Sequence, residues 1–321
     1  MGCKIDISCT VPLISVIMPV FNSEDFLERA LSSVATQTFS NFELIIINDG
    51  STDKSLDIIN SFVSKYKNFR LINNKNIGAS KSRNIGINEA KGKYIAFLDS
   101  DDFMDKNFLE VLYNKLLEDN SDIVCCNYYL YSQKTSSKSR DIFMIKSGKY
   151  GSKKLLGLLI KDFRMHHYIW NKLFKRSLFL DNNLKFKDMC FEDIEIMPKL
   201  FYFADKISVV NKALYYYVRH KDSMVSRLDI RKFNDYMRSL LYLRNFLESK
   251  GIYDEYRLSF LFYSLRIMIT NFKLIYFIHR DKGSLRGFFR DLGKAISKVS
   301  FCISGRFKCF KSDYIPKDTI N

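Results

Sequence analysis

The chain has 321 residues, 47% of them hydrophobic, so it can form one large domain or a domain with an appendage. Its net charge of +16 is uneven, because residues 221–321 hold 20 Lys and Arg against 10 Asp and Glu, a balance of 20 − 10 = +10. A basic segment suits nucleic acid, an anionic membrane face or a phosphorylated ligand, but the absence of helix-turn-helix, RRM and zinc-finger signatures excludes the common nucleic-acid binders.

The first half of the chain alternates strands and helices. Apolar runs predict strands at residues 13–20, 42–48, 69–73 and 94–98, and the segments between them predict helices that end near residues 37, 65 and 91. Such an alternation with short connections predicts an α/β fold, in which a mostly parallel sheet is doubly wound by helices.

After residue 102 the pattern changes. Helices are expected at 105–118, 153–160 and 193–204, strands at 122–131 and 214–218, and a polar, mobile loop at 132–140. From residue 231 to about 300 the sequence predicts helices only. We therefore expect two parts, a domain at 12–226 and a basic helical region at 227–321.

The cysteines and the first residues bear on location. The seven cysteines are odd in number and form no CxxC pair, which is typical of reduced thiols in a cytoplasmic protein. Residues 1–10 lack the apolar core of a signal peptide, and no run of about 18 apolar residues predicts a transmembrane helix. We expect a cytoplasmic protein, and its basic region allows a peripheral position on the membrane.

Three predicted strands end in polar residues. The first strand ends in Pro19–Asn22, the second in Asp49–Ser51 and the fourth in Asp99–Asp101. A parallel sheet brings these ends to one edge, where open α/β sheets bind ligands. Neither GxGxxG nor GxxxxGK[ST] is present, which counts against a dinucleotide dehydrogenase and a P-loop NTPase.

Asp99 and Asp101 are the strongest candidates for metal chemistry. Two carboxylates two residues apart repel each other unless a cation or a proton lies between them. Mg²⁺ or Mn²⁺ would take their oxygens together with substrate phosphates. The alternative is that Ser100, Asp101 or Asp102 caps the helix expected from Asp105.

Four blocks of sequence resemble the successive signatures of family 2 glycosyltransferases: PVFNSEDFLERALSSVATQT, LIIINDGSTD, NIGASKSRNIGI and GKYIAFLDSDD. The resemblance is close over about residues 12–115 and continues more weakly to about residue 226 through WNKLFKRSLF, FEDIEI and YYYVRHKDSMVS. It implies the Rossmann-like GT-A fold, a nucleotide-sugar donor, a divalent cation and inversion at the anomeric carbon.

Site residues follow from the same resemblance. It puts Asp49 on the uracil ring, Asp101 and His220 on the metal, Asp193 with its neighbour Glu192 at the general base, and Trp170, more weakly, near the acceptor. The donor set that it implies is Pro19, Phe21, Asn22, Glu24, Asp49, Arg83, Asn84, Asp99, Ser100, Arg219, His220 and Ser223.

Several of these residues have plainer interpretations. Glu192-Asp193 could cap the helix that follows, His220 could be a solvated loop residue, and Trp170 could be part of the core. His166 and His167 are adjacent and are expected to point apart as surface residues.

The last third of the chain contains an apolar helical face. Residues 258, 261, 262, 265, 268, 269, 272, 275 and 276 fall on one side of the predicted helix. This face could pack on the first domain, or it could contact an anionic membrane surface with the help of the basic residues around it. Both interpretations remain open at this point.

The expected activity is inverting transfer of a hexose or N-acetylhexosamine from a nucleotide sugar, most simply a UDP-sugar. The acceptor would be a glycan or a lipid-linked glycan in cell-surface polysaccharide synthesis. Two alternatives are a sugar-1-phosphate nucleotidyltransferase and a non-catalytic subunit that binds nucleotide sugars. The first lacks its Gly-rich basic loop here, and the second would not need Asp99, Asp101 and Asp193.

Overall fold

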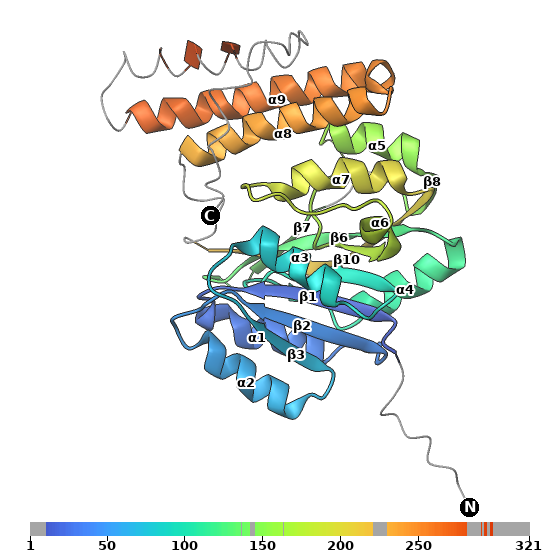
Figure 1. The fold of residues 1–321 in the computed structure, drawn as a ribbon, viewed down its shortest axis with the longest axis vertical. Helices are drawn as coiled ribbons and strands as arrows, with labels where there is room; N and C mark the ends of the chain where they lie inside the picture. The colour runs from blue at the N-terminus through green and yellow to red at the C-terminus, as the bar shows by residue number, and fades with distance from the viewer. Residues whose placement is uncertain are drawn as a thin grey trace, which may run out of the picture. The chain divides into compact units, whose positions relative to one another are not determined.

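The computed structural model describes residues 11–135, 137–141, 145–162, 164–220 and 230–280, with residues 290, 292, 293, 296 and 297 beyond them. The chain divides into two compact units, Met1–Ser226 and Arg227–Asn321. Unit 1 contains one large sheet with helices on both faces, and unit 2 contains two long helices (Figure 1). Each unit is described separately.

The sheet of unit 1 has ten strands among the described residues. They are β1 (Ile14–Val20), β2 (Phe42–Asn48), β3 (Phe69–Asn73), β4 (Tyr94–Phe97), β5 (Phe103–Met104), β6 (Ile123–Ser132), β7 (Ser137–Asp141), β8 (Gly148–Gly151), β9 (Lys172–Lys175) and β10 (Lys206–Arg219). Their order is β3-β2-β1-β4-β9-β6-β10-β5, with β7 on β6 and β8 on β10. β1, β2, β3 and β4 form one parallel block, and β6 is parallel to β10.

The helices of unit 1 connect and cover these strands. They are α1 (Glu24–Ala35), α2 (Ser55–Lys65), α3 (Ala79–Glu89), α4 (Phe108–Asp119), α5 (Ser152–Ile160), α6 (Ser177–Leu180) and α7 (Glu192–Phe203). Every residue of β1 and β2 is buried, as expected for parallel strands covered on both faces.

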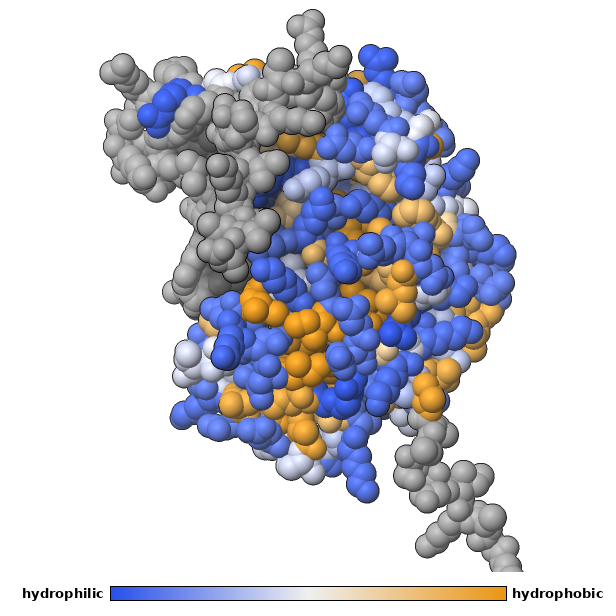
Figure 2. All heavy atoms as spheres, in the orientation of Figure 1, coloured by the Kyte–Doolittle hydropathy of each residue, from blue (hydrophilic) through white to orange (hydrophobic). Residues whose placement is uncertain are grey.

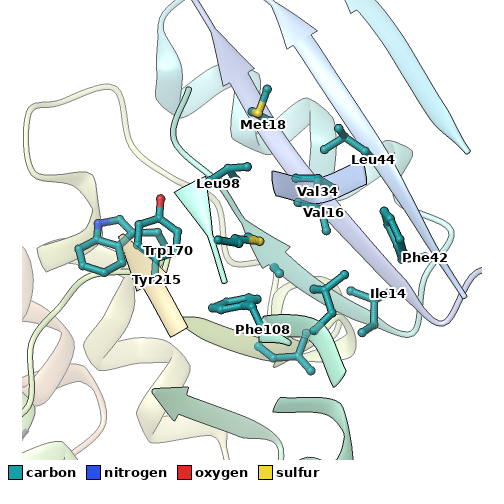
Figure 3. Close-up of a cluster of buried hydrophobic side chains, with 14 of the residues drawn as sticks. Ile14, Val16, Met18, Val34, Phe42, Leu44, Leu98, Phe108, Trp170 and Tyr215 are labelled. Carbon is teal, nitrogen blue, oxygen red and sulfur yellow. The ribbon is translucent and has the colours of Figure 1, made fainter. Parts of the chain in front are cut away.

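Alternate residues of β1 point to different layers. Ile14, Val16 and Met18 belong to the core cluster that includes residues of α1, α2 and α4 (Figure 3). Ile17 faces the other way, towards α3. A Cβ added to Gly86 of α3 would lie 2.3 Å from a methyl carbon of Ile17, so only glycine lets this helix approach the sheet so closely.

The sequence predicted the parallel block closely, but it was wrong about residues 132–140. The segment expected to be a mobile loop contains most of β7, which pairs antiparallel with β6. The polar side chains disguised a strand that is held by backbone hydrogen bonds to its neighbour. The short strand β9 was also missed, although it lies between β4 and β6 and joins the two parallel blocks.

Unit 2 consists of α8 (Ile230–Ser249) and α9 (Tyr253–Arg280). The turn between them uses Gly251 at φ +67°, a left-handed conformation that glycine adopts at no steric cost. The prediction of helices after residue 231 holds to residue 280, and most of the remainder lies outside the described residues. On the face shown in Figure 2, hydrophilic residues predominate, and an apolar patch lies over the strands near β3. Within the described part of the chain, no helix is both long and apolar enough to cross a membrane.

Candidate active site

The loops that follow β1 and β2 are tied together by hydrogen bonds. The Asn22 side-chain oxygen accepts the Thr52 N–H at 2.8 Å, and the Glu24 carboxylate accepts the Lys54 N–H at 2.9 Å. Asn22 lies at φ +46°, which lets the chain turn sharply at the end of the strand. Phe21 is left 46% exposed at this edge, next to Pro19, so an aromatic face is available to a flat ligand.

Asp49 lies at the end of β2 and is only 3% exposed. Its two carboxylate oxygens accept the N–H groups of Ile77 and Gly78, each at 2.7 Å. Asp49 thus fixes the loop that leads into α3. The expected contact with a uracil ring stays a prediction. A uracil N–H would have to bind carboxylate oxygens that already accept the N–H groups of Ile77 and Gly78.

The carboxylates after β4 do not cap a helix. β5 follows them and α4 begins only at Phe108, with Asn107 at its N-cap. Ser100 pairs with Ser23 of the β1 loop at 2.7 Å, and the Asp101 side chain is 32% exposed. The capping alternative is therefore wrong for Asp101, whose carboxylate contacts His220 instead.

Asp101 and His220 come together from distant parts of unit 1. The His220 Nε2 atom lies 2.9 Å from an Asp101 carboxylate oxygen, and the His220 ring packs against Phe26 of α1, tilted by 39°, with centroids 4.5 Å apart. Burial and the neighbouring Asp99 raise the pKa of Asp101, whereas the His220 contact lowers it. His220 is thus packed and paired, which argues against the solvated-loop interpretation.

This pair fits a divalent cation. One carboxylate oxygen and one imidazole nitrogen are ligands that Mn²⁺ accepts, and a cation on a nucleotide takes its other ligands from phosphate oxygens and water. Among the described residues, no group of three or more His, Cys, Asp or Glu side chains converges to hold a metal ion by itself. The protein alone therefore offers an incomplete site, which a diphosphate could complete.

Arg83 links the two sides of the site. It is buried on α3, and its guanidinium binds Asp99 at 2.7 Å and also Glu192, the first residue of α7. Burial alone would lower the pKa of Arg83, but the carboxylates of Asp99 and Glu192 raise it above its ordinary value. A fully charged guanidinium therefore holds the loop after β4 and the start of α7 at a fixed separation.

Asp193 is a partly buried carboxylate whose pKa is strongly raised. Burial and the adjacent Glu192 raise its pKa to about 8, although the Ile194 N–H and Arg83 act in the opposite direction. Phe191 is the N-cap residue of α7 and makes no side-chain cap, whereas the Asp193 carboxylate accepts the Ile194 N–H at 2.8 Å and so satisfies one amide of the first turn. A carboxylate with a pKa near neutrality can both accept and release a proton under ordinary conditions.

Two residues for which the sequence predicted no part in the site support the loop of Asp99–Asp101. Asp102 is buried, and its carboxylate accepts the Tyr215 O–H at 2.9 Å and the Val218 N–H at 2.7 Å. The Tyr215 hydroxyl in turn accepts the Asp99 N–H at 3.3 Å. Asp102 and Tyr215 therefore tie the Asp99–Asp101 loop to the end of β10 that carries His220. The third aspartate in LDSDD was the only local signal for this brace.

Other predicted residues have structural partners. Asn84 exchanges two hydrogen bonds with the backbone of Phe186, at 2.8 and 2.9 Å, and so anchors a loop to α3. Trp170 is 5% exposed and stacks between Tyr168 and Tyr215, with centroids 4.7 and 4.5 Å away (Figure 3 shows it beside Tyr215). This burial supports its interpretation as a core residue, and its acceptor contact stays a prediction. Arg219 is exposed at the end of β10, and Ser223 lies outside the described residues.

The prediction for His166 and His167 was wrong. Their Nδ1 atoms lie 3.0 and 3.4 Å from the same carboxylate oxygen of Asp162, and His167 is only 3% exposed. The chain does not continue as a helix or a strand here, so the rule that neighbouring side chains point apart does not apply.

An α/β sheet whose parallel strands end in carboxylates, with an arginine and a histidine beside them, is suited to bind an anionic ligand together with a cation. Residues 15–181 match the family described as Glycosyl transferase family 2, and the chain belongs to this family. A cholesterol galactosyltransferase of Borreliella burgdorferi is 34% identical over 274 residues, which are 83% of this chain and 76% of that protein.

Solved structures agree on the fold. S. aureus TarS, crystallised with UDP, matches with a TM-score of 0.68 at 21% identity over 91% of this chain and 81% of that chain, and its complex with UDP-GlcNAc gives 0.66. A mannosyltransferase of Pyrobaculum calidifontis, solved with GDP-Man and Mn²⁺, gives 0.53 at 14% identity over 92% of this chain and 86% of that chain. The protein is a glycosyltransferase with the GT-A fold and a helical C-terminal region, as its sequence predicted.

Proposed function

We propose that this glycosyltransferase moves a hexose or an N-acetylhexosamine from a UDP-sugar, with inversion, to an acceptor at the membrane surface. The observation that carries the proposal is the Arg83 bridge. One guanidinium joins Asp99, beside the metal candidates Asp101 and His220, to Glu192, beside the candidate base Asp193. Groups that would activate the leaving phosphate and the incoming hydroxyl are thereby held in one frame.

The donor would bind across the ends of β1, β2 and β4. The uracil ring of the donor would lie against the loop that contains Pro19, Phe21 and Asn22, near Asp49. The names of the structural neighbours support a nucleotide diphosphate there, since TarS was solved with UDP and with UDP-GlcNAc. We propose a UDP-sugar because two of these complexes contain uridine nucleotides, and a GDP-sugar, as in the GDP-Man complex, is the alternative that the release screen below distinguishes.

A divalent cation, Mn²⁺ or Mg²⁺, would be held by Asp101 and His220. When bound, it would neutralise charge on the departing diphosphate as a Lewis acid. The protein's own contribution is to hold these two ligands at 2.9 Å before any ligand binds, through the brace of Asp102 and Tyr215 and the packing of Phe26. Arg219, at the end of β10, would approach the diphosphate.

Asp193 would act as the general base. The acceptor hydroxyl would give its proton to the Asp193 carboxylate while its oxygen forms a bond to the anomeric carbon, and the bond from that carbon to the diphosphate oxygen would break on the opposite side. A pKa of about 8 suits this role, because proton transfer is most effective when the pKa of the base is close to the working pH. Glu192 raises that pKa and, through Arg83, keeps the start of α7 in position.

The acceptor is proposed to be lipid-linked or a membrane lipid. A relative with 34% identity is named a cholesterol galactosyltransferase, which supports an acceptor that resides in a bilayer. A lipid-linked glycan in cell-surface polysaccharide synthesis satisfies the same requirement. We accordingly propose a peripheral position on the cytoplasmic side of the membrane.

The test is a UDP- and GDP-release screen over nucleotide sugars with Mg²⁺ or Mn²⁺, in the presence and absence of lipid acceptors. We expect release from one or a few UDP-sugars, and a loss of about 10²-fold or more in Asp193→Asn. Asp181→Asn changes an exposed aspartate next to α6 and serves as a matched control that keeps full turnover. Preferential use of GDP-sugars would refute the donor assignment, and full activity of Asp193→Asn would refute the base.

A further inference from the structure

Strand β10 ends at the edge of the sheet where the candidate site lies. β4 and β6 both pair antiparallel with β9, and β10 pairs parallel with β6, so β4, β6 and β10 run in the same direction. Side chains alternate along a strand, which puts Tyr215 and Tyr217 on the same face of β10. Tyr217 lies two residues, roughly 7 Å, closer to the end of the strand than Tyr215. It is therefore the outer of two tyrosines that follow each other towards the site.

Both tyrosine rings pack on Trp170. The ring centroids of Trp170 and Tyr215 are 4.5 Å apart with 19° between the planes, and those of Trp170 and Tyr217 are 5.7 Å apart with 12° between the planes. Tyr168 also stacks on Trp170, at 4.7 Å and 13°. These nearly parallel rings hold the phenol of Tyr217 in one orientation, so its hydroxyl has a defined position at the edge of the sheet.

The hydroxyls of the two tyrosines differ in their partners. Tyr215 is fully buried, and its hydroxyl donates to Asp102 at 2.9 Å and accepts the Asp99 N–H at 3.3 Å. Tyr217 is partly buried, and its hydroxyl makes no hydrogen bond to any residue that the structure describes. This hydroxyl is not enclosed either, so a ligand can reach it. A phenol in this situation can donate one hydrogen bond to a ligand and accept another.

Tyr217 lies beside the groups proposed to bind the leaving diphosphate. The next residue, Val218, donates its N–H to Asp102 at 2.7 Å, and His220 contacts Asp101 at 2.9 Å. Burial and these two carboxylates raise the pKa of Tyr217 to about 12. The hydroxyl therefore keeps its proton near neutral pH, and it can act as a hydrogen-bond donor but not as a base.

The same stack of rings leads from Tyr217 towards the candidate base. Tyr168 shares Trp170 with Tyr217, and burial together with the carboxylates of Asp162 and Asp193 raises the pKa of Tyr168. The metal candidates are thus neighbours of one end of the stack, and Asp193 is a neighbour of the other. In the proposed inverting reaction the sugar lies between the leaving diphosphate and the base, because the acceptor oxygen attacks from the side opposite the diphosphate. Tyr217 is accordingly close to the position of the transferred sugar.

We propose that the hydroxyl of Tyr217 donates a hydrogen bond to a hydroxyl group of the transferred hexose. This inference rests on the function proposed above and names a contact for the sugar part of the donor. A site that binds a substrate hydroxyl in this way discriminates against analogues that lack it, because its own polar group is then left without a partner. Tyr217 would therefore help to select the sugar, whereas the nucleotide would be bound by other residues.

The test uses the full-length chain with UDP and with UDP-glucose, UDP-galactose and UDP-GlcNAc. Tyr217→Phe keeps the ring and its stack and removes only the hydroxyl. We expect this variant to bind UDP within about twofold of the unchanged protein, by calorimetry, and to lose about tenfold in kcat/KM for the best of the three donors, by UDP release. Among analogues of that donor that lack one sugar hydroxyl each, one should lose about tenfold with the unchanged protein and nothing further with Tyr217→Phe.

The matched control is Tyr113→Phe. Tyr113 is a partly buried tyrosine on α4, and its ring packs on Phe39 and Tyr94 with centroids 4.8 and 5.7 Å away. This variant should keep the kcat/KM of the unchanged protein, and urea unfolding should give similar stabilities for all three proteins. An unaltered kcat/KM in Tyr217→Phe would overturn the proposal, as would an equal loss of UDP affinity or equal losses in the two variants.

The same measurements separate this inference from the proposed function. If the unchanged protein releases UDP from no nucleotide sugar, the proposed function fails and the role of Tyr217 fails with it. If the unchanged protein uses a UDP-sugar and Tyr217→Phe uses it equally well, only the role of Tyr217 fails. A loss confined to KM for the acceptor, with unchanged hydrolysis of the donor by water, would assign Tyr217 to the acceptor and overturn the sugar contact.

Discussion

The raised pKa of Asp193 allows a quantitative prediction, because it affects both the proposed proton transfer and the free energy of unfolding. Burial and Glu192 raise its pKa to about 8, whereas an aspartate in an unfolded chain has a pKa of about 3.9. Between these two values the folded protein retains a proton that the unfolded chain has released. The unfolded state then binds fewer protons than the native state, so the free energy of unfolding falls as the pH rises through this window.

The variant Asp193→Asn removes this titration and keeps the shape of the side chain. One pH unit inside the window corresponds to about 1.4 kcal/mol. The stability of Asp193→Asn relative to the unchanged protein should therefore increase by up to about 2.7 kcal/mol between pH 5.5 and pH 7.5. The variant is expected to be an inactive enzyme that is more stable at neutral pH, as is common when a catalytic group is removed from an environment that disfavours its charge.

Urea unfolding of both proteins at several pH values measures this difference directly. A second variant, Glu192→Gln, takes away the charge that helps to raise the pKa of Asp193, so its pH window should end at a lower pH. The turnover of the unchanged protein should rise with pH towards and through 8, as Asp193 becomes ionised. A stability difference that does not vary between pH 5.5 and 7.5 would show that Asp193 is already ionised there, and the reasoning would fail.

Three other variants test the rest of the site. Asp101→Asn should reduce turnover by about 10²-fold or more and weaken Mn²⁺ binding, measured by titration, while thermal unfolding stays unchanged; retained activity in EDTA would contradict the metal role. Tyr215→Phe breaks the link between Asp99 and Asp102 and should cost about 1–3 kcal/mol in urea unfolding and raise the Mn²⁺ requirement; an unaltered Mn²⁺ titration would leave Tyr215 as a core residue only. Asp49→Ala should raise KM for the UDP-sugar, relax the preference for uracil and lower the unfolding temperature, and equal selectivity among nucleotides would exclude its base contact.

Local sequence patterns were sufficient to predict the parallel block of the sheet. The strands at Phe42–Asn48 and Phe69–Asn73 have the predicted bounds, because a short apolar run between polar turns has few other ways to be buried. The parallel topology predicted that the polar strand ends meet at the carboxyl edge of the sheet. The resemblance to a family suggested roles for individual residues only where its motifs were intact. β7 and β9 could not be predicted in this way, because each is defined by pairing with distant residues rather than by its own composition.

The arrangement of the site depends on contacts that no local pattern contains. Arg83 and Glu192 are 109 residues apart in the sequence, and Asp102 and Tyr215 are 113 apart. In both pairs a buried polar group of one segment satisfies a group of the other, so each segment would lose stability if the other moved. These contacts hold the loop after β4, the start of α7 and the end of β10 together. A change to Arg83 or Glu192 should therefore affect both the proposed donor side and the proposed acceptor side of the site.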